Sequence, residues 1–545
     1  MTLPGGRSVA AGACALGGGL LAALAFPPFG FLPGLAGFGL VLWSLTAPGG
    51  RAGDAPVRTA ALRGWLAGVG YFAVSVCWVV EPFLVDERTY GWMAPFALVL
   101  MAGGLSLFWA AAAAFWRWTG TRGLQGLLAF AACLSAAEWL RGHVLTGFPW
   151  NLPGEAWPAG SPLSQGAALA GAYGLTWVTL VLSAAPAWIL GPAPAARRGM
   201  RAVAVAGAFL ALYAWGAGRI AATPLAPAGP VVRIVQADID QKTKWRPENL
   251  EGIFRTYLDL STRPAATPPA LVVWPEGALP AVINDLLAPG APGRVALARA
   301  LAPGQVLAMG ANRVEMDADG ALTYRNSLVL LQGTGSDLAL AGVYDKHRLV
   351  PFGEFMPLGD LAGRIGLRSL VHMPEDFTPG PPPVPLRLPG LPDVQPMICY
   401  EALFPGFTRA ASLRSGARPA WILNVSNDAW FGRASGPWQH LNMARYRAIE
   451  EGLPIVRSTP TGVSAVIDSS GRTLGPVLGL GASGVIDLAL PPARPPTPYA
   501  RWGDLPFLAL LILSAALAGH KEIFIGLANR RRRSRARRDP DGAVP

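Results

Sequence analysis

Apolar segments long enough to cross a membrane fill the first 220 residues, and they limit the possible fold more than any other feature. Seven such segments lie near 8–26, 31–47, 64–83, 92–116, 123–140, 165–190 and 201–217, and an eighth lies near 505–520. A helix needs about 20 mostly apolar residues to cross the hydrocarbon core. Only 14% of the residues are charged, against about 25% in soluble domains. The sequence therefore predicts a polytopic α-helical membrane domain over 1–220 and a C-terminal transmembrane helix within 501–528.

The arginines between these segments indicate how the helices are oriented. The loops after the first, third and fifth segments hold mainly Arg88 and Arg141. The loops after the second, fourth and sixth segments are richer, with Arg51, Arg58, Arg63, Arg117, Arg122, Arg197, Arg198 and Arg201. Arginine-rich loops stay in the cytoplasm, so we expect residues 221–500 outside it and the basic tail 529–545 inside it. A cleaved signal peptide is the alternative for the first segment, but no convincing polar cleavage region precedes the turn at 26–29.

The formal net charge of +12 does not indicate a nucleic-acid-binding protein, because it is not spread over one domain. Seven arginines lie in the last sixteen residues, directly after the eighth apolar segment. That position is typical of a cytoplasmic membrane flank or of a contact with anionic lipid headgroups. Of the four cysteines, only Cys399 lies outside the apolar runs, and no cysteine has metal-ligand spacing. We expect no metal, no cofactor and no nucleic acid.

Residues 221–500 show the short alternating elements of an α/β domain. Runs typical of strands occur at 231–235, 271–274, 305–309, 327–331, 396–399, 421–425 and 463–467, and helical patterns at 247–261 and 438–450. Strands that alternate with helices indicate a layered α/β fold. The proline-rich stretch 376–395 has no periodicity, and it is predicted to be a long mobile loop ahead of Cys399.

Three residues at or just after apolar runs are candidates for catalysis. Glu276 ends the motif LVVWPE, where a carboxylate at the rim of a sheet suits proton abstraction. Lys346, in DKHRLVPFGE, carries a compact positive charge that suits an oxyanion. Cys399, in PMICYE, would act as a thiolate nucleophile. Taken singly, each has an ordinary alternative: a solvated glutamate, a surface lysine and a buried inert cysteine.

Together and in this order, the three residues resemble the Glu-Lys-Cys pattern of the carbon–nitrogen hydrolase (nitrilase) superfamily. The surrounding residues match as well, in WPE, DKHRLVPFGE and ICYE, and further along in NVSNDAWFG (424–432) and RSTPTG (457–462). The resemblance covers essentially all of 230–490. It implies an extracytoplasmic α/β nitrilase-like domain, a four-layer α-β-β-α sandwich, within 221–500.

A nitrilase-like domain between a seventh and an eighth membrane segment is similar to the apolipoprotein N-acyltransferase family, which performs the last step of bacterial lipoprotein maturation. The membrane half adds EWLRGHVLTGFPWN (138–151), which is similar to the signature after the family's fifth span, and FPPF (26–29). Glu138 and Arg141 stand three residues apart at a helix end. For them we expect a local ion pair that orients the loop rather than a catalytic role.

This resemblance implies a ping-pong reaction. A phospholipid, chiefly phosphatidylethanolamine, would give its sn-1 acyl chain to Cys399, with Glu276 as base and Lys346 as oxyanion donor. The thioester would then acylate the α-amino group of the diacylglyceryl-cysteine at an apolipoprotein's N-terminus. The resemblance also implies supporting roles for Glu354, Tyr400 and Glu401, and a substrate-binding role for Trp245, for which ordinary packing is an equal alternative.

Apolar side chains near the motifs are candidates for a lipid entrance, namely Phe352, Phe355, Met356 and the stretch 376–395. A site beside the outer leaflet would avoid extracting acyl chains, at about 0.8 kcal/mol per CH₂. Two other functions stay open: a tethered amidase or nitrilase for a small soluble amide, and a silent sensor or scaffold, against which the complete Glu-Lys-Cys set speaks. We expect a multi-pass protein of the bacterial inner membrane, and a monomer, because membrane spans would block surfaces through which many soluble nitrilases assemble.

Overall fold

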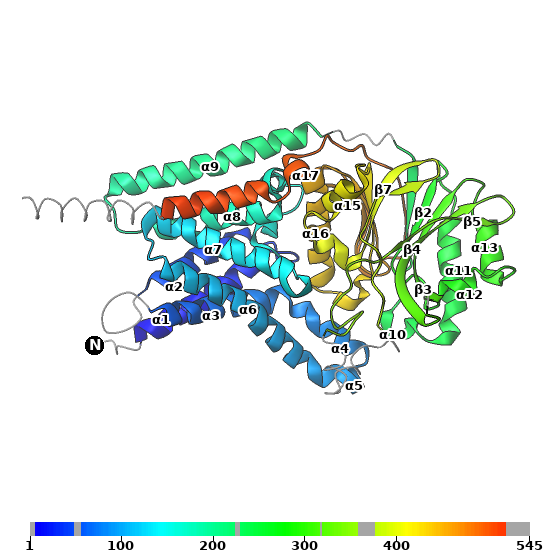
Figure 1. Cartoon of the computed structure of the whole chain (residues 1–545), viewed down its shortest axis with the longest axis horizontal. Coiled ribbons are helices and arrows are strands. Elements are labelled where there is room, and N and C mark those ends of the chain that lie inside the picture. The colour runs from blue at the N-terminus through cyan, green and yellow to red at the C-terminus, as the bar shows by residue number, and fades with distance from the viewer. Residues whose placement is uncertain (1–5, 48–55, 224–228, 317–318, 358–375, 519–545) are drawn as a thin grey trace, which may run out of the picture.

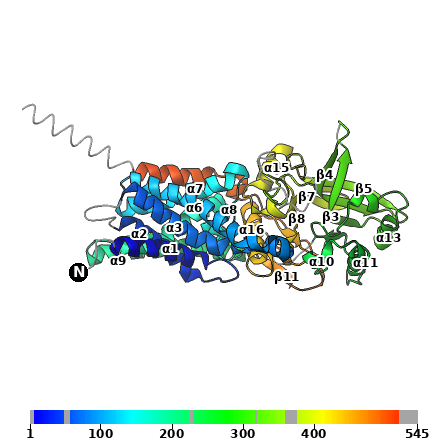
Figure 2. The same ribbon diagram turned by 90° about the horizontal axis from the view of Figure 1, so that it is seen from below.

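The computed structural model describes residues 6–47, 56–223, 229–316, 319–357 and 376–518. The chain has two halves that lie end to end, a helical half formed by residues up to 221 and a half with two sheets formed by 231–489 (Figures 1 and 2). The C-terminal helix Leu505–Ala518, red in Figure 1, returns to the helical half. The two sequence regions predicted to differ in character are therefore separate in space.

The helical half contains a helix at each of the seven apolar segments. These are α1 (Gly6–Ala23), α2 (Gly37–Thr46), α3 (Val57–Ser75), α6 (Ala94–Trp118), α7 (Gly123–His143), α8 (Ala167–Ile189) and α9 (Ala195–Ala221), with the short α4 (Glu81–Val85) and α5 (Glu87–Tyr90) between α3 and α6. Four stretches of the described residues, Glu87–Trp118, Gly123–Thr146, Leu163–Ile189 and Ala195–Ala221, are long and apolar enough to cross a membrane. A fifth qualifies if Val57–Ser75 and Cys77–Val85, bent by 63°, form one span. The helices lie where they were predicted, while the number of membrane crossings stays a prediction.

Helix α1 packs against α3 at a distance that only glycine permits. A Cβ atom on Gly19 would lie 1.9 Å from the carbonyl oxygen of Ala67, and one on Gly70 would lie 2.1 Å from that of Leu16. Small residues let membrane helices approach closely, which increases their van der Waals contact. Such close packing is typical of helices that associate within a membrane, while retention of the first segment stays a prediction.

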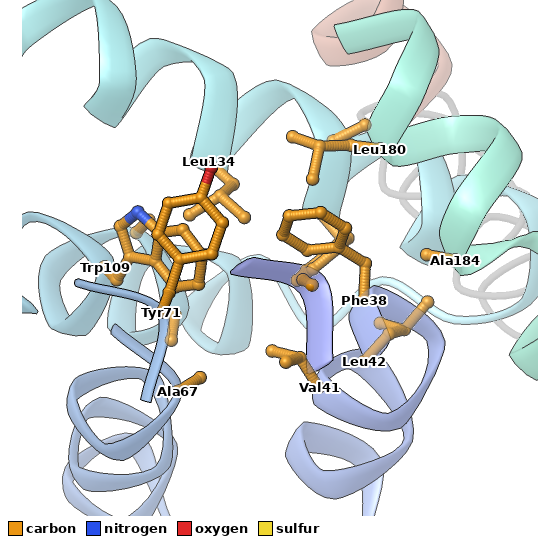
Figure 3. Packing of buried hydrophobic residues seen from close by; sticks show 14 of the residues in the cluster. Phe38, Val41, Leu42, Ala67, Tyr71, Trp109, Leu134, Leu180 and Ala184 are labelled. Carbon is orange, nitrogen blue, oxygen red and sulfur yellow. The ribbon is translucent and has the colours of Figure 1, made fainter. Parts of the chain in front are cut away.

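Buried side chains from six helices, α1 to α3 and α6 to α8, form the core of the helical half, part of which is shown in Figure 3. The rings of Tyr71 on α3 and Trp109 on α6 are 4.8 Å apart, and Phe38 on α2 packs 6.2 Å and 6.0 Å from them. The hydroxyl of Tyr71 donates a 2.8 Å hydrogen bond to the carbonyl oxygen of Asn151. The core therefore also holds the loop after α7, which leads toward the sheets.

The other half is built on two six-stranded sheets, ordered β12-β1-β2-β3-β4-β5 and β11-β10-β9-β8-β7-β6. Their strands are β1 (Val231–Gln236), β2 (Leu271–Trp274), β3 (Val306–Met316), β4 (Leu322–Gly333), β5 (Leu338–Asp345), β6 (Leu386–Leu388), β7 (Leu391–Ile398), β8 (Trp421–Val425), β9 (Ile455–Ser458), β10 (Ser464–Ile467), β11 (Thr473–Leu478) and β12 (Gly484–Ala489). Strands β1 to β3 are parallel, as are β7 to β9. The carboxyl ends of parallel strands meet at one edge of a sheet, so loops there converge.

The two sheets pack face to face and carry helices on their outer faces. Apolar side chains of both sheets, among them Ile234, Val273 and Leu423, fill the space between them. Helices α11 (Leu250–Ser261) and α13 (Pro292–Ala300) cover the first sheet, and α15 (Phe407–Ser415) and α16 (Gly436–Glu451) cover the second. This arrangement confirms the predicted α-β-β-α sandwich. Tyr446 and Ile449 on α16 also pack against the helical half, so α16 lies at the junction (Figures 1 and 2).

The prediction of one long loop over 376–395 is wrong in part. Residues from 376 onward are described, and they include β6 and the first residues of β7, which joins the second sheet. The prolines misled the prediction. Pro392 and Pro396 lie within β7; a proline has no N–H to donate but keeps its carbonyl acceptor, and that of Pro392 accepts a 3.0 Å hydrogen bond from Trp421 Nε1.

Candidate active site

Three strand ends bring Glu276, Lys346 and Cys399 to the same edge of the sandwich. Glu276 follows β2 by two residues, and Lys346 and Cys399 directly follow β5 and β7. Lys346 Nζ lies 3.1 Å from Glu276 Oε1, and the charge of a Cys399 thiolate acts on the same ammonium. Because β2 and β5 belong to one sheet and β7 to the other, the site is assembled across the interface of the two sheets.

The Lys346 ammonium is held between two carboxylates in the interior. Its Nζ donates to Glu276 Oε1 at 3.1 Å and to Glu354 Oε1 at 2.9 Å, and Asn326 Nδ2 donates to the same two oxygens at 2.7 Å each. The backbone N–H of Asn427 donates to Glu276 Oε2 at 2.7 Å. Burial by itself would lower the pKa of Lys346, but Glu276 and Glu354 outweigh it and raise that pKa well above its ordinary value. The side chain therefore carries a fixed positive charge next to Cys399.

Cys399 has the backbone of an exposed nucleophile turn but a buried side chain. Its φ is +48°, a left-handed conformation that is uncommon for a residue other than glycine. Residues in such conformations often occur at functional sites. The residue is 6% exposed. Burial raises the pKa of its thiol, and Glu276 raises it further, while Lys346 and a hydrogen bond with Ser426 lower it. The thiol is therefore protonated at neutral pH, and a base must take its proton before it can attack.

A buried polar cluster of Asp428, His440 and Arg457 contacts the backbone of Cys399. His440 Nε2 lies 3.1 Å from the carbonyl oxygen of Cys399, and His440 Nδ1 lies 2.9 Å from Asp428 Oδ1. Arg457 Nη2 donates to both carboxylate oxygens of Asp428, at 2.9 Å and 2.7 Å. Burial would raise the pKa of Asp428, but Arg457 and His440 hold it well below its usual range. The cluster therefore fixes the turn at Cys399 through its carbonyl oxygen.

Glu401 joins the turn at Cys399 to the segment that carries Lys346. Its Oε1 accepts hydrogen bonds from Tyr344 Oη at 2.7 Å, His347 N at 2.8 Å and Arg348 N at 3.1 Å. Its Oε2 accepts one from Ile398 N at 2.8 Å. Burial raises the pKa of Glu401 to about 7, although these hydrogen bonds oppose the shift. These contacts fix the spacing between the ends of β5 and β7, which gives a physical basis for the predicted supporting role of Glu401.

Tyr400 links the nucleophile turn to the helical half. Its hydroxyl donates a 2.5 Å hydrogen bond to the carbonyl oxygen of Gly147, in the loop after α7. Arg348, two residues after Lys346, donates to the carbonyl oxygen of Thr146 at 3.3 Å. At the base of the same loop, Arg141 forms a buried ion pair with Glu138 and donates to the carbonyl oxygen of Phe148. The predicted loop-orienting ion pair is confirmed.

The predicted substrate-binding residues differ in their surroundings. Trp245 is 47% exposed, and the preceding Lys244 donates to the carbonyl oxygen of Gly277, next to Glu276. Phe352 is 58% exposed and Phe355 is half-buried, but Met356 is 3% exposed. Of these three predicted residues, Phe352 is therefore the most exposed and Met356 is buried, and their role in a lipid entrance stays a prediction.

Known protein families match both halves of the chain. The family described as apolipoprotein N-acyltransferase N-terminal domain matches residues 18–185, and the carbon-nitrogen hydrolase family matches residues 231–494. An apolipoprotein N-acyltransferase of Caulobacter vibrioides is 51% identical over 94% of this chain and 94% of its own length. The chain belongs to the apolipoprotein N-acyltransferase family. A further apolipoprotein N-acyltransferase, from Bradyrhizobium diazoefficiens, is 40% identical over 93% of this chain and 94% of its own.

Among solved structures, an N-terminal amidase with a bound Asn-Glu-Ala peptide aligns with 37% of this chain and 48% of its own, with 11% identity and a TM-score of 0.24. That likeness is too weak to support an inference. Membership in the apolipoprotein N-acyltransferase family makes the chain a membrane-bound N-acyltransferase with a carbon–nitrogen hydrolase domain.

Several polar residues of the site could not be found from the three motifs. Asn326 lies within β4, in a stretch without a motif, and contacts Glu276 only because β4 pairs with β3 and β5. His440 lies in α16, which begins 37 residues after Cys399. A single histidine within a helix is most often a packing residue, so the sequence gives no specific signal for it. In the described part of the chain, no group of three or more His, Cys, Asp or Glu residues is arranged to hold a metal ion.

Proposed function

We propose that this chain transfers an acyl chain from a membrane phospholipid to the N-terminal amine of a diacylglyceryl-cysteine in apolipoproteins, through a thioester on Cys399. The observation that carries the proposal is the contact of Lys346 with Glu276 and Glu354 beside a buried cysteine whose backbone is held in the left-handed region. A base, a fixed cation and a nucleophile are the parts that acyl transfer requires.

In the first half-reaction, Glu276 takes the proton of the Cys399 thiol and the thiolate attacks the ester carbonyl carbon of the phospholipid. The carbonyl oxygen becomes an oxyanion, which Lys346 stabilises with its fixed positive charge. The C–O bond of the ester then breaks, the leaving lysophospholipid oxygen takes the proton from Glu276, and the acyl chain stays on sulfur. Asn326 and Asn427 N keep the Glu276 carboxylate directed at this point.

In the second half-reaction, the free amine of the diacylglyceryl-cysteine attacks the thioester carbonyl. Glu276 accepts the proton lost by the amine, and Lys346 again stabilises the oxyanion. The C–S bond breaks, and Cys399 recovers its proton from Glu276. The products are an amide and the original enzyme, so the cycle needs no cofactor.

The arrangement of the two halves supports a membrane orientation with the sandwich outside the cytoplasm. The C-terminal ends of α2, α6 and α8 lie at the end of the helical half away from the sandwich (Figure 1), and the arginine-rich segments follow these helices in the sequence. Arginine-rich ends stay in the cytoplasm. We therefore assign 1–220 and 501–528 to the inner membrane of a bacterium, 529–545 to the cytoplasm and 221–500 to the periplasmic side. A monomer would suffice, because both sheets and all three catalytic groups come from one chain.

A transfer assay with purified protein tests the proposal. Phosphatidylethanolamine labelled in its sn-1 chain would be incubated with a diacylglyceryl-cysteine peptide, and labelled amide would be measured by mass spectrometry. We expect product with the wild type, none with Cys399→Ala, and a loss of about 10² to 10³-fold with Lys346→Met, as for other oxyanion donors. The same peptide with its amine acetylated should give no product. Hydrolysis of a small soluble amide without acyl transfer would instead support a tethered amidase.

A further inference from the structure

A shallow hollow of about 490 Å³ opens on the surface where the end of α9 meets the sandwich. It is lined by Ala214, Trp215, Gly218, Arg219 and Arg494. Four of these residues come from the last turns of α9, and Arg494 comes from the chain just after β12. Helix α9 lies along the outer edge of the helical half, and its C-terminal end reaches the junction (Figure 1). Since the hollow lies outside the Glu276, Lys346 and Cys399 site, its chemistry is not used by the reaction above.

The two guanidinium groups in the hollow are held by neutral oxygen atoms. Arg494 Nη1 donates to the carbonyl oxygen of Arg219 at 2.9 Å and to Thr223 Oγ1. Arg219 donates to Gln165 Oε1 and to the carbonyl oxygen of Ile449. Each guanidinium has five N–H donors, so both retain donors that these contacts do not use.

No carboxylate among the described residues forms an ion pair with Arg219 or Arg494. Asp468, whose charge acts on Arg219, is itself paired with Arg472 Nη2 at 2.6 Å. Two neighbouring cations without an acidic partner repel each other, and an anion placed between them would remove that repulsion. Planar guanidinium groups bind phosphate oxygens through paired N–H donors. The hollow therefore has the chemistry of a phosphate site.

The helix that carries this hollow faces lipid. In the most apolar 18-residue stretch of α9, only 6% of the residues are buried. Val203 and Leu210 are 73% and 61% exposed. From Arg201 near one end to Arg219 near the other, the helix rises about 27 Å at 1.5 Å per residue, close to the thickness of the hydrocarbon core, about 30 Å. Arg219 therefore lies at the depth of the phosphate groups of one leaflet.

Aromatic side chains lie about 6–9 Å along the helix from Arg219, on the side of the hydrocarbon. Tyr213 and Trp215, one to two turns before Arg219, are 46% and 40% exposed. Tyrosine and tryptophan are enriched where a membrane protein passes from the hydrocarbon to the headgroups. A lipid at this position would place its acyl chains along the exposed apolar face of α9 and its phosphate against the two arginines.

We propose that the hollow between Arg219 and Arg494 binds the phosphate of a membrane phospholipid, as a site separate from the catalytic one. The lipid would hold the end of α9 against the sandwich, because Arg219 belongs to the helix and Arg494 to the chain that follows the last strand. The proposal depends on the membrane position of α9 and not on the thioester chemistry.

Lipid binding to the full-length protein in detergent can be counted by native mass spectrometry during titration with phosphatidylglycerol. The variants are Arg219→Gln, Arg494→Gln and the double variant, with Arg299→Gln as the matched control, because Arg299 is an exposed arginine on α13. A cation near an anionic lipid surface contributes on the order of fivefold to binding. We therefore expect the tightest bound lipid to be held about 30-fold more weakly by the double variant and unchanged by Arg299→Gln.

Thermal unfolding provides a second readout, the shift in melting temperature when lipid is added. Each variant is compared with its own lipid-free melting temperature, so the variants need not be equally stable. Phosphatidylglycerol should raise the melting temperature of the wild type, and of an Arg219→Lys/Arg494→Lys variant in part, but not of the double glutamine variant. Diacylglycerol with the same chains and free glycerol phosphate should each give little or no shift.

Equal lipid binding by the wild type and the double glutamine variant would overturn the proposal. An equal shift with diacylglycerol would show that phosphate is not recognised, and an equal shift with glycerol phosphate would show a site for a free anion rather than for a lipid. Thioester formation on Cys399, measured in the same samples, should be retained by the double variant. Its absence from the wild type would refute the proposed catalytic function and leave this test of the hollow intact.

Discussion

Glutamine in place of Glu401 should destabilise the candidate active site, because its side chain can accept fewer hydrogen bonds. One carboxylate oxygen accepts from Tyr344 Oη, His347 N and Arg348 N, and the other accepts from Ile398 N. A glutamine has a single acceptor oxygen. In the least costly orientation, that oxygen keeps the three donors of the first group, and the amide NH₂ is left facing the N–H of Ile398.

The cost can be worked from these contacts. A buried donor without an acceptor costs about 1–3 kcal/mol, and the three remaining hydrogen bonds lose the strengthening that a charged acceptor gives, together on the order of 1 kcal/mol. Because burial raises the pKa of Glu401 to about 7, only part of the wild-type molecules carry this charge at neutral pH. The substitution therefore removes a charge from that part only. We expect the free energy of unfolding to fall by about 2–4 kcal/mol. Ile398 directly precedes Cys399, and a displacement of about 1 Å at a reacting group can slow the chemistry about 10²-fold.

Thermal unfolding and single-turnover thioester formation on Cys399 measure the two effects. Tyr344→Phe is the matched control, because it removes one donor to Glu401 and leaves the bond from Ile398; it should cost about 1 kcal/mol and change the rate little. A Glu401→Gln variant with wild-type stability and rate would refute the bridging role of Glu401. So would a Tyr344→Phe variant that is affected as strongly.

Three further predictions concern the junction, the lipid entrance and the helical core. Burial raises the pKa of Glu155 to about 8 and that of Glu450 to about 7, above the ordinary value of 4.5, so the folded protein favours their protonated forms. Their contribution to the free energy of unfolding should be complete below about pH 5 and be lost as the pH rises through 7 and 8. Glu155→Gln should therefore make the melting temperature decline less between about pH 5 and 8, and an equally steep decline in the variant would contradict this. Phe352→Asp, at an exposed position that tolerates aspartate, should reduce acyl transfer from phospholipid about tenfold or more with an unchanged melting temperature, and full activity would exclude Phe352 from the lipid entrance. Gly70→Ala should lower the melting temperature, at about 1–3 kcal/mol for overpacking, whereas Gly104→Ala on α6, whose Cβ would meet nothing within 4 Å, should leave it unchanged or raise it slightly; equal effects would refute the close helix contact.

The sequence predicted the helices and most central strands because their signals are local. Runs of apolar residues predicted α1 to α3 and α6 to α9. They also predicted the strands β2 and β8, and for these two strands the predicted bounds match the structure at both ends. The edge strands were missed. β11 has no buried side chain, and β5 contains a register shift opposite Leu330 and Leu331, so neither shows the regular alternation that identifies a strand from sequence.

The positions of Glu276 and Cys399 at strand ends could be predicted, whereas Lys346 follows β5, a strand that was missed. The residues that support the three side chains could not be predicted either. Asn326 and His440 reach the site through strand pairing and helix packing between segments far apart in the sequence. Burial of Met356 depends likewise on tertiary packing, which no local pattern reports. Whether the three strand-end residues act as base, oxyanion donor and nucleophile stays a prediction that experiment must decide.

The formation of a thioester on Cys399 is tested most directly by intact mass spectrometry of the purified protein after exposure to phosphatidylethanolamine. The account predicts a mass increase of one fatty acyl chain in the wild type, its removal by hydroxylamine at neutral pH, and no increase in Cys399→Ala. No adduct on a folded protein whose Cys399 still reacts with a thiol probe would contradict the account.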